Sequence, residues 1–140
     1  MSRTPEHDEQ AALFVWARTW ANHGTHAIPA LRTLHASLNG VKLTPGQAKK
    51  AKAAGMLAGA WDVFLPYPAM WAGDQYGGLY IEMKYGRNGL TTEQELYREE
   101  VGGYFVWRVC RTWDTAARTI LEYLAVPTTH PAWSGLEGLK

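Results

Sequence analysis

The order of the predicted elements indicates an α/β fold in which helices flank a small mixed central β-sheet. Three short apolar runs, at residues 61–65, 79–84 and 104–110, are typical of strands. Stretches with helical periodicity or helix caps lie before, between and after these runs. Two strands in succession, followed by a helix and a further strand, predict a sheet with both antiparallel and parallel neighbours.

The length and composition of the chain fit one domain of this kind. The protein has 140 residues, of which 46% are hydrophobic and 19% are charged, a globular composition. No apolar run approaches the roughly 20 residues of a membrane-spanning helix, and the first ten residues lack the apolar core of a secretory signal. The single cysteine, Cys110, excludes an internal disulfide and a cysteine-rich zinc site. We therefore expect a cytoplasmic protein with no membrane partner.

The predicted elements follow one another with short connections. They are a helix at 8–22, a short extended segment and loop at 26–38, a helix at 45–54, a strand at 61–65, a loop at 67–78, a strand at 79–84, a helix at 91–101, a strand at 104–110 and a helix at 114–124. The last stretch has no periodicity and contains prolines and glycines. We expect a domain at 1–125 and a loosely attached C-terminal tail at 126–140.

Apolar spacing and capping residues predict the four helices. In the first helix, Trp16 and Trp20 recur at helical spacing. Thr44, followed by proline, is typical of an N-cap and the first helical position of the second helix. Thr91 and Asp114 are the expected caps of the third and fourth helices.

The formal charge of +1 is unevenly distributed along the chain. Residues 28–90 contain seven Lys or Arg and three Asp or Glu, so this segment carries +4 and the two flanks together carry −3. Such a basic zone predicts a face that binds a polyanion. The charge alone is equally compatible with a solvated lysine-rich helix.

The sharpest chemical feature is the run Ile81-Glu82-Met83-Lys84 in a predicted strand. Because side chains two residues apart share a face of a strand, Glu82 and Lys84 lie on one side. Asp62 lies among apolar residues in the preceding strand. If these strands are neighbours, Asp62 and Glu82 converge on one cation, and carboxylates with water suit Mg²⁺. The alternative for Glu82 and Lys84 is a simple ion pair on the strand surface.

The order and spacing of these features resemble the VRR-NUC domain, the virus-type replication and repair nuclease branch of the PD-(D/E)xK (restriction-endonuclease-like) superfamily. The resemblance covers roughly residues 8–124. The stretches that carry it are GMLAGAWDVFLPYP and GLYIEMKYGRNGLTTEQ, and the matching positions are Glu9-Gln10, Asn39-Gly40, Gly59, Asp62, Glu82, Lys84 and Gln94. One position departs from the family pattern, because the proline before the aspartate is Trp61 here.

The resemblance implies a role for each matching residue. Asp62, Glu82 and the backbone carbonyl of Met83 would bind Mg²⁺ or Mn²⁺, and Glu9 would approach the same metal or a second one. Lys84 would orient or activate the attacking water, and Gln94 would order the water or the phosphate. For Glu9 and Gln94, the alternatives are ordinary helix-start residues exposed to solvent.

The resemblance further implies hydrolysis of DNA phosphodiester bonds. The expected contacts to DNA are Asn39, Lys42, Lys49, Lys52 and Arg87. Stand-alone members of the family imply a phage-type endonuclease selective for branched DNA such as a Holliday junction, acting in phage DNA replication, repair or recombination. A homodimer would present two sites to such a substrate. The alternative from another class is a non-catalytic nucleic-acid-binding protein that retains the nuclease fold.

Overall fold

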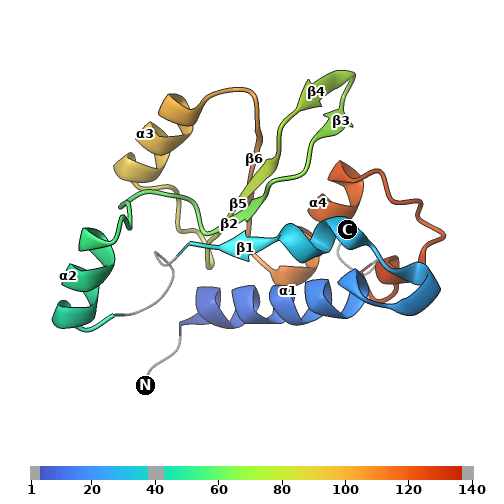
Figure 1. The fold of residues 1–140 in the computed structure, drawn as a ribbon, viewed down its shortest axis with the longest axis horizontal. Helices are drawn as coiled ribbons and strands as arrows, with labels where there is room; N and C mark the ends of the chain where they lie inside the picture. Colours follow the sequence, from blue (N-terminus) through green and yellow to red (C-terminus); the bar gives the residue numbers. More distant parts are fainter. Residues whose placement is uncertain (1–3, 38–42, 137–140) are drawn as a thin grey trace.

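A four-stranded mixed sheet forms the centre of the computed structural model, which describes residues 4–37 and 43–136 (Figure 1). Its strands, in spatial order, are β1 (His35–Ala36), β2 (Val63–Leu65), β5 (Leu79–Met83) and β6 (Val106–Cys110). Strand β2 pairs with both β1 and β5 in antiparallel orientation, whereas β5 and β6 are parallel. The predicted α/β fold with a mixed sheet flanked by helices is therefore confirmed.

Helices α1 (Pro5–Ala21) and α4 (Trp113–Tyr123) pack together and form the core with the sheet. Leu13 and Trp16 of α1 and Ile120 and Leu121 of α4 are buried against the strands. The sheet contributes residues such as Ile81, which is completely buried. Burial of these side chains is the main stabilising contribution to the fold.

Helices α2 (Pro45–Ala53) and α3 (Thr92–Val101) lie to one side of this core (Figure 1). Neither helix has a buried residue. Each begins with a capping box, in which Thr44 pairs with Gln47 and Thr91 pairs with Gln94. Both predicted caps are therefore confirmed.

Other element boundaries differ from the sequence prediction. Helix α1 begins three residues earlier than expected, because Thr4 is its N-cap and Pro5 occupies its first turn. The N-cap of α4 is Thr112, whose side chain accepts a hydrogen bond from the amide of Thr115, so the assignment of Asp114 as the cap is wrong. Most of the segment at 26–38 forms the short 3₁₀ helix η2 (Pro29–Thr33) and strand β1; a further turn, η1 (Gly24–His26), precedes it.

The predicted loop at 67–78 contains a β-hairpin. Its strands are β3 (Ala69–Trp71) and β4 (Asp74–Tyr76), which form a separate two-stranded sheet. The turn consists of Ala72 and Gly73, with φ values of 50° and 89°. Two positive φ values are typical of a type I′ hairpin turn, in which Asn-Gly is the usual signal and alanine is rare. The usual sequence signal of such a hairpin is therefore absent at this turn.

The C-terminal segment packs on the core, so the expectation of a loosely attached tail is wrong for residues 126–136. The indole N–H of Trp16 donates to the carbonyl of Ala132 at 3.4 Å, and the indole N–H of Trp133 donates to the carbonyl of Val126 at 3.1 Å. The short helix η4 (Pro131–Trp133) lies between these contacts. Leu136 is completely buried. No helix among the described residues is long and apolar enough to cross a membrane.

Replacing Leu136 by alanine is expected to destabilise the protein by about 2–4 kcal/mol. The substitution removes completely buried apolar surface and leaves a cavity in the core. Urea denaturation followed by circular dichroism measures the change. Leu57→Ala is the control, because that side chain is 58% exposed and its loss should change the free energy of unfolding little. Equal values for the two variants would show that the segment does not contribute to the core.

Candidate functional site

Two acidic side chains are buried where β2 begins and β5 ends. Among the described residues with charged side chains, Asp62 and Glu82 are the buried ones, at 6% and 3% exposure. The antiparallel pairing of Val63 with Ile81 places the residues that flank this pair, Asp62 and Glu82, side by side. The structure therefore brings together the two carboxyl groups that the sequence predicted to converge.

Each carboxyl group accepts a hydrogen bond from a backbone amide of the neighbouring segment. The amide of Asp62 donates to Glu82 Oε1 at 3.0 Å, and the amide of Met83 donates to Asp62 Oδ2 at 3.0 Å. The carboxyl groups also lie within hydrogen-bonding reach of each other. These reciprocal contacts fix the position of both side chains before any ligand arrives.

Burial raises the pKa of both carboxyl groups. The pKa of Glu82 rises from 4.5 to about 8, first because of burial and then because of the neighbouring Asp62. Burial also raises the pKa of Asp62, although hydrogen bonds to Glu82 and Met83 act in the opposite direction. At neutral pH the pair accordingly retains a proton, which a cation between the two groups would displace.

This pKa shift predicts a pH dependence of stability. The folded state binds more protons than the unfolded state between pH 4.5 and about 8, so the contribution of Glu82 to stability is present below pH 4.5 and is lost as the pH rises toward 8. Chemical denaturation of the protein in chelator at several pH values measures this loss. Glu82→Gln, which cannot ionise, should remove it. Parallel pH profiles for the two proteins would contradict the raised pKa.

Lys84 and Gln94 complete the surroundings of Glu82. The ammonium group of Lys84 lies 3.7 Å from Glu82 Oε2, and its side chain is only 11% exposed. Gln94, from the first turn of α3, donates from Nε2 to the same oxygen at 2.8 Å. Its Oε1 accepts from the amide of Thr91 in the capping box. The structure thus brings two further predicted residues to Glu82, on the same side of the strand.

The first turn of α3 is held close to the carboxyl groups by the residues around Asp62. The indole N–H of Trp61, which is 2% exposed, donates to the carbonyl of Gln94 at 3.0 Å. Gly59 has a φ of 90°, and a Cβ atom there would lie 2.5 Å from the carbonyl oxygen of Glu93. Only glycine allows the chain to approach α3 this closely. Trp61 therefore has a definite role at the position where the family pattern has proline.

Glu9 does not join this group of side chains. Its Oε1 accepts a hydrogen bond at 2.7 Å from the amide of Trp113, the first residue of α4. Glu9 therefore satisfies an otherwise unpaired amide at that helix start. Within 4–37 and 43–136, no group of three His, Cys, Asp or Glu residues is arranged to hold a metal ion.

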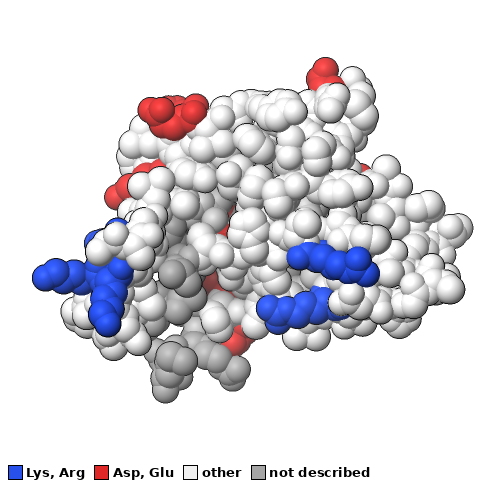
Figure 2. All heavy atoms as spheres, viewed as in Figure 1, with Lys and Arg blue, Asp and Glu red and all other residues white. Residues whose placement is uncertain are grey.

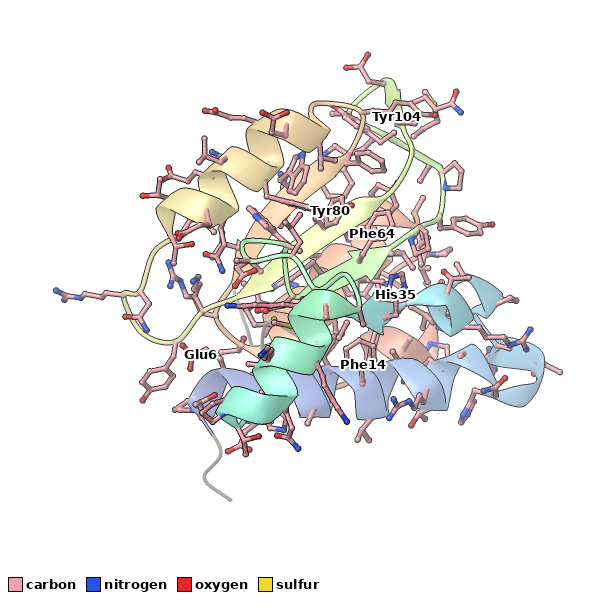
Figure 3. All side chains as sticks on the ribbon, turned by 60° about the vertical axis from the view of Figure 1, so that its left-hand side comes forward. Glu6, Phe14, His35, Phe64, Tyr80 and Tyr104 are labelled. Atoms are coloured by element: carbon pink, nitrogen blue, oxygen red, sulfur yellow. The ribbon has the colours of Figure 1, made fainter. Side chains whose placement is uncertain are left out.

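Glu6 is the acidic residue of α1 whose charge acts on Asp62. It contributes to the raised pKa of Asp62 through charge repulsion. Figure 3 shows Glu6 at the N-terminal end of α1. Sequence reasoning missed this residue, although its spacing of three from Glu9 places both glutamates on one side of the helix. Glu9 was predicted instead because it matches the family pattern.

Three of the five predicted contacts to DNA lie among the described residues, and all three are exposed. Lys49 and Lys52 are exposed on α2, and Arg87 is exposed in the turn after β5. A cleft of about 370 Å³ separates α2 from β1 and α3, and Ser37, whose amide donates to the carbonyl of Asp62, is part of its lining. Figure 2 shows the surface hollowed beside α2, with acidic atoms visible inside the hollow. Asn39 and Lys42 lie outside the described residues.

Comparison with known proteins identifies the fold. A solved structure described as a VRR_NUC domain protein superimposes with a TM-score of 0.62 over 90% of this chain and 93% of its own chain, at 23% sequence identity. No family model matches the sequence, and no curated protein matches it. The chain therefore has the fold of a VRR-NUC domain, which is the fold that the sequence motifs predicted.

Proposed function

We propose that this protein is a metal-dependent deoxyribonuclease that hydrolyses phosphodiester bonds. The observation that carries the proposal is the buried pair of Asp62 and Glu82 beside Lys84, in a fold shared with a VRR_NUC domain protein. Buried carboxyl groups that face each other without a resident cation are unfavourable, which is why such pairs are typical of functional sites.

The chemistry of these side chains fits a hard divalent cation. Asp62 and Glu82 supply carboxylate oxygens, which Mg²⁺ and Mn²⁺ prefer, and Met83 adds a backbone carbonyl as a proposed ligand. When bound, such an ion polarises a phosphate and lowers the pKa of a bound water. No third acidic side chain completes the site within the described part of the chain, which suits Mg²⁺ because this ion retains several waters.

The remaining residues of the site would orient the reactants. The ammonium group of Lys84 is fixed beside Glu82 and is placed to hold the attacking water or to stabilise negative charge on the phosphate. Gln94 holds Glu82 Oε2 through its amide nitrogen and so limits the orientations of that carboxylate. The lysines of α2 would neutralise phosphates beside the cleft.

A branched substrate and a homodimer form part of the proposal. A two-fold dimer would enlarge the surface available to DNA and present two sites to a four-way junction. A role in phage DNA replication, repair or recombination agrees with such a substrate.

Cleavage of labelled DNA tests the proposed function directly. Four-way junction, flap, single-stranded and plain duplex substrates are each incubated with Mg²⁺, with Mn²⁺ and with chelator. We expect cleavage only with metal, and most rapidly for the four-way junction. Binding of DNA without cleavage of any substrate would instead support a non-catalytic nucleic-acid-binding protein. Sedimentation of the protein with and without junction DNA tests the homodimer.

The two glutamates of α1 are expected to respond differently to substitution. Glu6→Ala should weaken Mn²⁺ binding several-fold, because the negative charge that acts on Asp62 is lost. Glu9→Ala should instead lower the free energy of unfolding by about 1 kcal/mol, because the amide of Trp113 loses its partner. Calorimetric titration with Mn²⁺ and urea denaturation measure the two effects. If only the Glu9 variant bound Mn²⁺ more weakly, Glu9 would be the glutamate that acts at the metal site, as the sequence predicted.

A further inference from the structure

A groove between α1 and η2 contains two arginines whose charges are not neutralised by neighbouring acids. The groove has a volume of about 280 Å³, and its lining includes Arg18, Arg32 and Phe14. Both arginines are exposed. Neither was among the DNA contacts that the sequence predicted, because they lie 14 residues apart and on different elements.

Local contacts hold both guanidinium groups in place. The guanidinium carbon of Arg18 lies 5.6 Å from the centre of the Phe14 ring. Arg32 donates from Nε to Oδ1 of Asn22 at 3.0 Å. In the part of the chain that the structure describes, neither arginine forms an ion pair with a carboxylate. Two oriented cations without a counter-charge are suited to bind an external anion.

The groove lies on the same face of the molecule as α2. Figure 2 shows basic side chains at two places on one face, over α2 on the left and over α1 and η2 on the right. The hollow that contains acidic atoms lies between them. Exposed acidic side chains on this face gather instead along its upper edge, over α3 and the β3–β4 hairpin. The hollow is therefore bordered by positive charge on two sides.

We propose that the groove of Arg18 and Arg32 binds the phosphate backbone of DNA, on the face of the molecule that also carries the α2 lysines. This inference rests on the proposed function and extends it, since it assigns the path of the substrate across the molecule. Arginine binds phosphate through two parallel N–H groups, and such contacts position DNA without reading its sequence. The α2 lysines and this groove would hold the substrate at two points, with the scissile bond over the carboxyl pair.

The salt dependence of DNA binding tests the proposal. The double variant Arg18→Gln/Arg32→Gln is compared with wild type by fluorescence anisotropy, with a labelled four-way junction, in chelator and over a range of salt concentrations. Each lost phosphate contact lowers the slope of log affinity against log salt by about 0.9. We expect the slope to fall by up to roughly 1.8 and the affinity at low salt to fall at least about tenfold.

Two control variants separate location from net charge. Arg98→Gln/Arg108→Gln removes the same charge from a different pocket, beside α3 and β6, and should retain the wild-type slope. Arg18→Lys/Arg32→Lys keeps the charge and should retain most of the slope. Melting temperatures verify that all variants are folded.

The outcomes distinguish a failure of the groove assignment from a failure of the proposed function. Equal slopes for wild type and the Arg18/Arg32 variant, or equal losses in both glutamine variants, would overturn the assignment of the groove while leaving cleavage by the wild type intact. A wild-type protein that neither binds nor cleaves any DNA would overturn the proposed function and the groove together.

Discussion

Replacing Glu82 by glutamine is expected to reduce metal-dependent DNA cleavage by at least about 10³-fold. The variant keeps the size of the side chain and an oxygen that can accept from the amide of Asp62. It removes one of the two carboxylates available to a divalent ion, and electrostatic stabilisation of this kind is worth several kcal/mol. Single-turnover cleavage of the preferred DNA substrate with Mg²⁺ measures the loss.

The fold of this variant should remain intact, which distinguishes a lost function from a lost structure. Glutamine resembles the protonated form of Glu82, which the buried environment favours, so the variant should remain folded at pH 8 in chelator even though its amide nitrogen cannot accept the hydrogen bond from Gln94 Nε2. Glu99→Gln, at an exposed position on α3, is the control for the loss of one negative charge elsewhere. Cleavage by Glu82→Gln at the wild-type rate would show that the carboxyl pair is structural.

Replacing Trp61 by phenylalanine is expected to weaken Mn²⁺ binding by about 10-fold to 100-fold. The substitution removes the hydrogen bond to the carbonyl of Gln94 but keeps an aromatic ring against Trp107, whose ring centre lies 4.9 Å away. Gln94 then loses its fixed position, and with it the hydrogen bond that orients Glu82. Residues that orient metal ligands typically change metal affinity by this factor. Calorimetric titration with Mn²⁺ alone, without DNA, measures the affinity.

The chain offers a matched control for this substitution. The indole N–H of Trp107 donates at 3.0 Å to the carbonyl of Gly102, at the opposite end of the same helix. Trp107→Phe therefore removes the same kind of hydrogen bond from the C-terminal end of α3, with a similar cost of about 1 kcal/mol in stability, and leaves the hydrogen bond from Trp61 to Gln94 in place. Equal effects of the two variants on Mn²⁺ affinity would mean that Trp61 acts only through the stability of α3.

The carboxyl pair could be located from the sequence because its position follows from strand geometry. Asp62 and Glu82 interrupt apolar runs, and alternation of side chains separates Glu82 and Lys84 from the core-facing residues. An acidic residue inside an apolar run can be recognised from its neighbours in the sequence alone. Pairing of the strands at 61–65 and 79–84 was the simplest arrangement, because they follow one another along the chain. The roles of these residues in catalysis stay predictions.

The features that the sequence did not reveal depend on contacts between distant segments. Residues 126–136 are held by partners such as Trp16, more than a hundred positions away, so no local pattern predicts their burial. Glu9 was predicted to approach the metal because it matches the family pattern, and only the start of α4, 104 positions away, shows that its carboxylate is engaged there. The hairpin at 69–76 was missed because Ala72 adopts a conformation that its residue type disfavours.

The contact between Trp16 and Ala132 joins residues separated by 116 positions, and the ring of His130 likewise contacts the carbonyl of His26 across 104 positions. During synthesis, α1 is made about a hundred residues before these partners. Contacts of such long sequence separation slow folding, because the chain between them must first be ordered. The part of α1 that packs against α4 and residues 126–136 consequently stays uncovered until those residues have been made, and only then can this side of the core close.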